Sequence, residues 1–204
     1  MKTIAVFHLL VSLIVLSACA PAESTEPVVS TVMPTATEEP TSLDYYPLST
    51  RTGIADVDAV LAAVESGDAQ ALRDLIRLTT VGCTKTEGLG GPPKCREGEA
   101  EGTLVNVLPF LGPEGHFLYE SELSKFPGVD VLGLYAVYAV SDSAYSEEAY
   151  PTGEYAAMFT TKDDQTVIVF QIRNGIVRID YLYPSSSLRE IVQRDASELI
   201  LAPK

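Results

Sequence analysis

The sequence predicts an α+β domain with N-terminal helices, a curved antiparallel sheet and a short C-terminal helix. Three observations predict this fold class. Apolar residues recur with helical spacing over residues 56–76, extended apolar runs follow over residues 103–182, and a capping-box pattern at residues 187–190 opens a last helical stretch. Helices first, a meander of strands next and a helix last are typical of an α+β fold.

The first helical stretch begins at Asp56, which can cap a helix N-terminus, and ends at Gly67, which suits the residue after a helix. Its apolar residues recur at i, i+3, i+4 and i+7: Val57, Val60, Leu61 and Val64. Asp68 can cap a second helix, whose apolar face is Leu72, Leu75 and Ile76. We expect a bent helix or a helical hairpin with its break at residues 66–68.

A β-hairpin that turns at Asn174 and Gly175 is the clearest local prediction. Asn-Gly between two β-branched runs favours a type I′ turn, because that turn needs positive φ at both central residues. The expected pairs are Arg173 with Ile176, Ile172 with Val177, Phe170 with Ile179, and Ile168 with Tyr181. The preceding strand joins through a four-residue turn, and its expected pairs are Phe159 with Ile168, Ala157 with Phe170, and Tyr155 with Ile172.

This register gives the three strands two distinct faces. One face is apolar or aromatic throughout, and we expect it to be the core: Tyr155, Ala157, Phe159, Ile168, Phe170, Ile172, Val177, Ile179 and Tyr181. The other face is mixed and includes Met158, Val169, Gln171, Arg178 and Asp180. We interpret the mixed face either as a hydrogen-bonded sheet exterior or as the face of a homodimer.

Further elements complete the pattern. Residues 103–111 form an apolar run in which Pro109 indicates an edge strand or a bulge. Residues 131–140 are almost continuously apolar, as expected of a strand covered on both faces. Residues 121–126 fit a single helical turn. The apolar residues expected on the C-terminal helix are Leu188, Ile191, Val192 and Leu199.

The N-terminus has the features of an export signal. Lys2 precedes an apolar run over residues 4–16, which is too short to span a bilayer and leads into Leu16-Ser17-Ala18-Cys19. This ending resembles the bacterial lipobox. The resemblance covers residues 1–19 only; it implies cleavage before Cys19, fatty acylation of that cysteine and a lipid anchor on an extracytoplasmic face of the bacterial cell envelope. An ordinary signal peptide or a membrane anchor is the alternative.

The chain divides into three parts by composition. Residues 1–18 are the expected signal peptide. Residues 19–47 are rich in Pro, Thr, Ser and Glu and contain no Lys or Arg, so we expect a disordered tether. Residues 48–204 have the length of one domain with one core. The net charge of −14 argues against nucleic acid or anionic headgroups as partners, because both would be repelled.

Cys83 and Cys95 are expected to form a disulfide bond, since they lie a short loop apart in an exported protein. A loop of this size contributes about 3 kcal/mol of stability in the chain-entropy model. The glycines of residues 88–91 do not form a phosphate loop, because two prolines follow where a helix should open. Two sulfur atoms without a nearby His also fall short of a zinc site, so no metal or cofactor is expected.

Two stretches carry a further resemblance. Residues 56–76, with Gly67-Asp68 in the middle, are similar to the opening helices of nuclear-transport-factor-2-like and SnoaL-like domains, and residues 167–183 are similar to their closing hairpin. The match covers about half of the domain and includes no catalytic motif. It implies a curved sheet wrapped around a helix, a cone-like or cystatin-like roll whose interior is often a pocket. Catalytic members place an Asp, His or Arg inside the cone.

The expected core face carries no side chain that titrates near neutral pH, so no general base is expected there. Its aromatic residues are the candidates for lining a pocket: Tyr155, Phe159, Phe170 and Tyr181. His116, the only histidine after residue 8, is the candidate for catalysis. The leading hypothesis is non-enzymatic binding of a small apolar or aromatic ligand, or of a protein. A SnoaL-like enzyme and a purely structural envelope protein are the alternatives.

Overall fold

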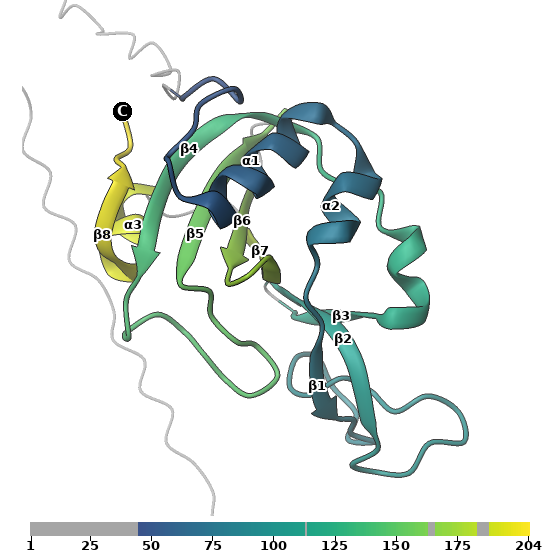
Figure 1. Cartoon of the computed structure of the whole chain (residues 1–204). Coiled ribbons are helices and arrows are strands. Elements are labelled where there is room, and N and C mark those ends of the chain that lie inside the picture. The colour runs from purple at the N-terminus through teal and green to yellow at the C-terminus, as the bar shows by residue number, and fades with distance from the viewer. Residues whose placement is uncertain (1–44, 113, 163–165, 183–187) are drawn as a thin grey trace, which may run out of the picture. The chain divides into compact units, whose positions relative to one another are not determined.

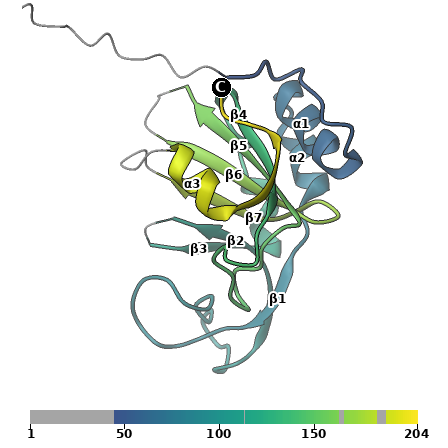
Figure 2. The ribbon, with the colours of Figure 1, turned by 90° about the vertical axis from the view of Figure 1, so that its left-hand side faces the viewer.

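The described residues form one mixed eight-stranded sheet with helices on both faces (Figures 1 and 2). The computed structural model describes residues 45–112, 114–162, 166–182 and 188–204, all within one compact unit, Ser42–Lys204. The expected signal peptide, Cys19, most of the expected tether and Ser187 of the capping box lie outside these residues. Among the described residues, no helix is long and apolar enough to cross a membrane.

The elements follow one another as α1 Ala55–Ser66, α2 Ala69–Leu75, β1 Thr79–Gly82, β2 Leu104–Leu111, β3 His116–Tyr119, the 3-10 helix η1 Glu120–Lys125, β4 Val131–Val140, β5 Tyr155–Thr161, β6 Val167–Ile172, β7 Ile176–Leu182, α3 Leu188–Asp195 and β8 Ala196–Leu201. The strand order is β1-β2-β7-β6-β5-β4-β8, with β3 on β2. β2 runs parallel to β7, which pairs Phe110 with Ile179 and Leu111 with Asp180. The α+β class is confirmed, but the sheet is mixed and not wholly antiparallel as expected.

The two N-terminal helices form a helical hairpin, and one of the expected caps differs. α1 begins at Ala55, and the carboxylate of Asp56 accepts a hydrogen bond from the backbone N–H of Asn174 (3.1 Å) instead of capping its own helix. Gly67 has φ 66° and ends α1 in the left-handed conformation, as expected. Asp68 caps α2 by accepting from the backbone N–H of Gln70, also as expected.

The register of the central strands is confirmed except at the turn. All three expected β5–β6 pairs are present, as are Phe170 with Ile179 and Ile168 with Tyr181. A bulge next to the turn pairs Ile172 with Ile176, because the backbone N–H of Arg173 bonds to the carbonyl oxygen of Gly175 (2.8 Å) and lengthens the loop. Ile176 therefore takes the core position expected for Val177, which is only half-buried.

The apolar face of the sheet forms the main core beneath α1 (Figure 1). Phe159 and Phe170 are 1% and 0% exposed, and their rings meet edge to face at 5.8 Å. The opposite face is also buried, under α3 (Figure 2). There Leu188, Ile191 and Val192 of α3 share a cluster with residues of β4, β5 and β6, so the expected helical face is confirmed for these three.

The C-terminal helix is shorter than expected. α3 ends at Asp195, and Leu199 lies instead in β8, where it pairs with Tyr138 on the edge of β4. Pairing with an open sheet edge overrides the helical spacing of the sequence. The domain also begins earlier than residue 48, because Tyr46 exchanges backbone hydrogen bonds with Leu134 and its hydroxyl donates to the carbonyl oxygen of Ala202 (2.9 Å).

The disulfide bond between Cys83 and Cys95 is present, with an S–S distance of 2.03 Å. It closes the loop that follows β1. The backbone reinforces this closure, since Thr84 donates to the carbonyl oxygen of Pro93 (2.8 Å) and Cys95 donates to that of Thr84 (2.9 Å). The stapled loop is therefore held both covalently and by hydrogen bonds.

Candidate functional site

Two adjoining open grooves meet at Tyr181, near the C-terminal end of β7. Their volumes are about 670 Å³ and 520 Å³, and both are lined by Thr161 and Tyr181. We call the two together the Tyr181 groove. Its other lining residues are Gly112, Glu114, Gly115, His116 and Thr166 on one side, and Gly128, Val129, Asp130, Lys162 and Ile168 on the other.

The parallel pairing of β2 with β7 places these residues together. It brings the C-terminal ends of both strands to the same edge, so that the turn after β2 passes beside Tyr181. A Cβ atom built on Gly112 would lie 3.5 Å from the carbonyl oxygen of Tyr181, which shows how close the two segments run. The segments flanking the β5–β6 turn contribute Thr161 and Thr166, whose backbones are hydrogen-bonded to each other.

Two residues that line the groove, His116 and Tyr181, belong to an aromatic stack. Phe110 is buried between two rings, with the His116 ring at 4.8 Å and 10° and the Tyr181 ring at 5.8 Å and 15°. Antiparallel pairing of β2 with β3 puts His116 directly opposite Phe110. Because Phe110 belongs to the main core and Tyr181 packs against it, the stack connects the core to the groove.

Three polar groups on this side of the groove have no hydrogen-bond partner among the described residues, whereas Thr161 donates its hydroxyl to the carbonyl oxygen of Thr166 (2.8 Å). The Glu114 carboxylate, the His116 imidazole and the Tyr181 hydroxyl make no hydrogen bond or ion pair with any described residue. Burial lowers the pKa of His116 below its usual 6.5, so the imidazole is neutral at pH 7. Burial raises the pKa of Tyr181, so its hydroxyl stays protonated. These groups can donate to or accept from a ligand.

The other side of the groove carries a compensated pair of charges. Lys162 Nζ lies 2.5 Å from Asp130 Oδ1, and both side chains are largely exposed. Exposed pairs of this kind contribute little to stability. Gly128, Val129 and Ile168 add an apolar wall beside the pair. The groove therefore combines aromatic rings, apolar area, three unengaged polar groups and one ion pair.

Of the four expected pocket residues, only Tyr181 lines the groove. Phe159 and Phe170 fill the middle of the core, and Tyr155 is half-buried against it. His116, the candidate for catalysis, also lines the groove, so two of the five residues that the sequence singled out for a pocket or for catalysis lie there. Glu114, Thr161 and Thr166 were missed. They lie in or next to turns that only the β2–β7 pairing brings together, and the sequence carries no motif for that pairing.

The five residues expected on a dimer face are buried within the chain. Met158 and Val169 pack in the cluster under α3, and Gln171, Arg178 and Asp180 are 4%, 2% and 6% exposed. α3 and the loop of residues 141–154 cover this face of the sheet, so these side chains are not available to a second copy. The hydrogen-bonded interpretation fits this face, although it lies inside the domain and not on its exterior.

Arg178, Asp180 and Gln171 form a buried hydrogen-bonded network. Arg178 Nε and Nη2 donate to the two carboxylate oxygens of Asp180 at 2.6 and 3.1 Å, and Gln171 donates to Asp180 at 3.0 Å. Arg178 Nη1 also donates to the carbonyl oxygens of Tyr145 (3.0 Å) and Tyr150 (2.9 Å) in the covering loop. Because every member is bonded to another or to that loop, the network acts as a structural clamp.

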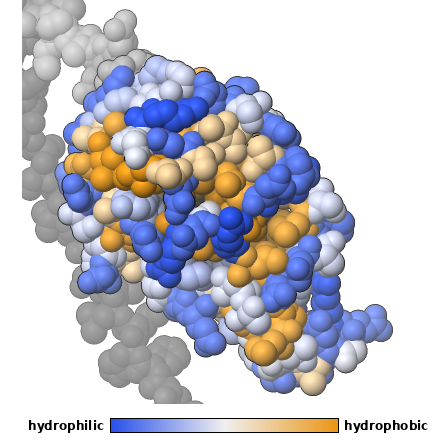
Figure 3. Space-filling view, viewed as in Figure 1, coloured by the Kyte–Doolittle hydropathy of each residue, from blue (hydrophilic) through white to orange (hydrophobic). Residues whose placement is uncertain are grey.

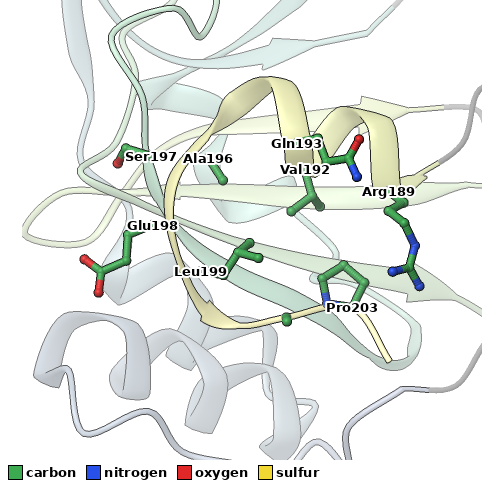
Figure 4. Close-up of a pocket in the computed structure, with 9 residues that line it drawn as sticks. Arg189, Val192, Gln193, Ala196, Ser197, Glu198, Leu199 and Pro203 are labelled. Atoms are coloured by element: carbon green, nitrogen blue, oxygen red, sulfur yellow. The ribbon is translucent and has the colours of Figure 1, made fainter.

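Two other surface features, a groove at the C-terminus and the exposed apolar areas, are less suited to binding a ligand. A groove of about 280 Å³ lies between α3 and β8, where Val192, Leu199 and Pro203 are flanked by Arg189 and Glu198 (Figure 4). None of its described lining residues is aromatic, and Arg189 donates to the backbone of Lys204. On the face seen in Figure 3, apolar residues reach the surface in several separate areas and not as one continuous patch.

A further cluster lies at the disulfide bond. The sulfur atoms of Cys83 and Cys95 and a carboxylate oxygen of Glu99 lie within 4.8 Å of one another. Sulfur atoms joined in a disulfide are not thiolates, and thiolates are the form in which cysteine binds metals. The geometry therefore gives this cluster no role as a metal site while the disulfide is intact.

Comparison of the chain with protein-family models, with curated proteins and with solved structures finds no match.

Proposed function

We propose that this chain is a lipid-anchored, extracytoplasmic binding protein that holds a small apolar or aromatic ligand in the Tyr181 groove. The observation that carries the proposal is the set of unengaged groups beside the aromatic stack. Glu114, His116 and Tyr181 line the same groove, and their polar side-chain atoms make no hydrogen bond or ion pair with the described residues. Concave sites with apolar walls and a few convergent polar groups are typical of small-molecule binding.

The anchor is proposed from the sequence alone. Leu16-Ser17-Ala18-Cys19 supports acylation of Cys19, and the tether that follows would hold the domain away from the membrane. Cells that express the full chain should incorporate labelled palmitate into it, and the Cys19→Ala variant should take up none. Equal labelling of both proteins would contradict the anchor.

The proposed relationship is with the nuclear-transport-factor-2-like domains. Two N-terminal helices against one face of the sheet, and a closing hairpin at the end of the chain's central strands, support a cone-like roll. In such a roll the middle is filled by Phe159 and Phe170, and the ligand would sit at the mouth beside Tyr181. A protein with a filled core and an empty mouth would instead fit the purely structural alternative.

A SnoaL-like enzyme is the second candidate, because His116 lines the groove and is neutral at pH 7. A neutral imidazole can act as a general base. Catalytic bases are usually oriented by a hydrogen bond from a third group, and His116 has no such bond in the described part of the chain. Binding is therefore favoured over catalysis. Once a substrate is known, unchanged turnover by His116→Ala would exclude His116 as the catalytic residue.

Native mass spectrometry on the domain from residue 45, purified without denaturation, tests the binding proposal. We expect a retained small molecule on the unmodified domain and its loss from Tyr181→Leu, which removes a ring and a hydroxyl from the groove. Leu199→Ala, in the groove between α3 and β8, is the matched control and should retain the molecule. Retention by Tyr181→Leu would contradict the site. The same spectra report whether the domain is a monomer or a homodimer.

A domain that carries nothing is the remaining outcome. In that case, screening aromatic compounds by thermal shift should find ligands that stabilise the unmodified domain but not Tyr181→Leu. A screen that finds none would favour the structural role.

A further inference from the structure

The uncompensated charge of the Tyr181 groove is negative. Asp130 is paired with Lys162 at 2.5 Å, and His116 carries no charge at pH 7. Glu114 has no ion-pair partner among the described residues. Of the described side chains that line the groove, Glu114 therefore supplies the only charge that is not balanced by a neighbour.

The aromatic stack, like the negative charge of Glu114, favours a positively charged ligand. The face of an aromatic ring is electron-rich and attracts a cation, and the effect grows when water is partly excluded. Tyr181 is half-buried and keeps its hydroxyl proton. Its ring is therefore neutral, and its attraction for a cation comes from the electron-rich face. Glu114 lines the same groove as Tyr181, so we expect the ring and the carboxylate to attract one cation together.

The charge of the whole chain adds to this local attraction. At −14 it raises the concentration of cations around the domain and lowers that of anions. An anionic ligand would meet Glu114 without a free cation among the described lining residues, because Lys162 is already paired with Asp130. A neutral ligand would leave the exposed Glu114 carboxylate to water and gain nothing from its charge.

From these observations we infer that the ligand of the Tyr181 groove is a small organic cation with a flat or compact apolar body, such as an aryl ammonium. This inference rests on the proposed function and specifies its ligand class. Glu114 would hold the positive charge, and Tyr181 would contact the apolar body. His116 must be neutral for such a ligand to bind, because its protonated form would repel the cation.

Three probes of one shape separate the charge from the body of the ligand: 4-hydroxyphenyltrimethylammonium, 4-tert-butylphenol and 4-hydroxybenzenesulfonate. Their affinities for the domain are measured by calorimetric or NMR titration at pH 7.5 and low salt. We expect the cation to bind about fivefold or more tightly than the neutral probe. The sulfonate should bind most weakly.

Two variants connect the result to the residues. Glu114→Gln should lower the affinity for the cation about two- to fivefold and leave the affinity for 4-tert-butylphenol unchanged. Tyr181→Leu should lower the affinity for both the cation and 4-tert-butylphenol. Glu148→Gln, which removes an exposed carboxylate on the loop of residues 141–154, outside the Tyr181 groove, is the control for the general effect of charge and should shift the cation affinity less.

The outcomes separate the two proposals. Equal affinity for the cation and the neutral probe, lost in Tyr181→Leu, would overturn the cationic ligand class while supporting the groove. Tighter binding of the cation that Glu114→Gln and Glu148→Gln weaken equally would assign the preference to net charge and would also overturn the role of Glu114. Saturable binding by none of the three probes would count against both proposals.

Discussion

Replacing Asp180 with Ala is expected to destabilise the domain strongly, because it leaves the charge of Arg178 buried without its counter-ion. The side chains of Arg178 and Asp180 are 3% and 8% exposed, and two hydrogen bonds join them. Removing one partner of such a pair typically costs about 3–5 kcal/mol. The two carbonyl oxygens that Arg178 also contacts do not neutralise a full charge. Gln171 would lose its bond to Asp180 as well.

The magnitude can be checked by urea denaturation of the domain with its disulfide intact. A loss of this size corresponds to a decrease in Tm of roughly 10 °C for a domain of this length. Arg178→Met combined with Asp180→Leu should cost less than Asp180→Ala, because it removes both charges together. It still leaves the carbonyl oxygens of Tyr145 and Tyr150 with one partner fewer, so we expect a loss of about 1–3 kcal/mol.

Asp195→Ala is a control in which the cation left behind is exposed to water. Arg194 and Asp195 are also joined by two hydrogen bonds, at 2.7 and 2.8 Å, but the Arg194 side chain is 67% exposed, although that of Asp195 is only 16% exposed. Water replaces the lost partner there, so the expected cost is below about 1 kcal/mol. If Asp180→Ala cost no more than Asp195→Ala, the interpretation of the buried network as a clamp would be refuted.

A local readout distinguishes the clamp from a general loss of stability. The backbone N–H of Gly153 donates to Gln171, which in turn donates to Asp180. In Asp180→Ala, hydrogen exchange at Gly153 and across the loop of residues 141–154 should therefore accelerate more than exchange at Ala157 in the middle of β5. Uniform acceleration would show that the loop does not depend on the network.

Three further predictions concern single residues. Tyr150→Phe should leave the urea midpoint unchanged or raise stability by about 1 kcal/mol, because the Tyr150 hydroxyl is buried without a hydrogen-bond partner in the described part of the chain. Gly175→Ala should cost about 1–3 kcal/mol in the same assay, since Gly175 has φ 125° and its missing Cβ would collide with the carbonyl oxygen of Leu75; Asn174→Gly should cost less than about 1 kcal/mol. Burial lowers the pKa of His116 below its unfolded value of 6.5, so its contribution to stability is present above pH 6.5 and is lost as the pH falls. In His116→Gln the decrease of the urea midpoint between pH 7 and pH 5 should be smaller, and an unchanged decrease would assign it to other groups.

The sequence predicted the central strands well because their pattern is local. Alternation of side chains determines which residues share a face, and an Asn-Gly turn limits the register to a few choices. Two expected pairs there are wrong, Arg173 with Ile176 and Ile172 with Val177, because a hydrogen bond from Arg173 to Gly175 adds a residue to the loop and pairs Ile172 with Ile176. Alternation cannot detect such a bulge when Ile176 and Val177 are both apolar.

Long-range pairings were not predictable in the same way. β2 meets β7 across about seventy residues through two pairs only, and nothing in either strand marks the other as a partner. β8 was interpreted as helix because Leu199 continues the helical spacing of α3, whereas the free edge of β4 determines its conformation. The covering of the mixed face by α3 and the loop of residues 141–154 could not be inferred from the strands alone.

β7 shows why the candidate site lies at the rim of the sheet and not on its covered face. Arg178 and Asp180 lie on the covered face, where an unpaired polar group would be costly, and they bond to each other and to the loop above them. That pairing stabilises the domain but leaves neither group free for a ligand. Tyr181, one residue further on, lies on the other face beside an open groove, where water can solvate its hydroxyl and the carboxylate of Glu114 until a ligand replaces it. The same strand therefore carries polar groups committed to the fold on one face and groups available for binding on the other.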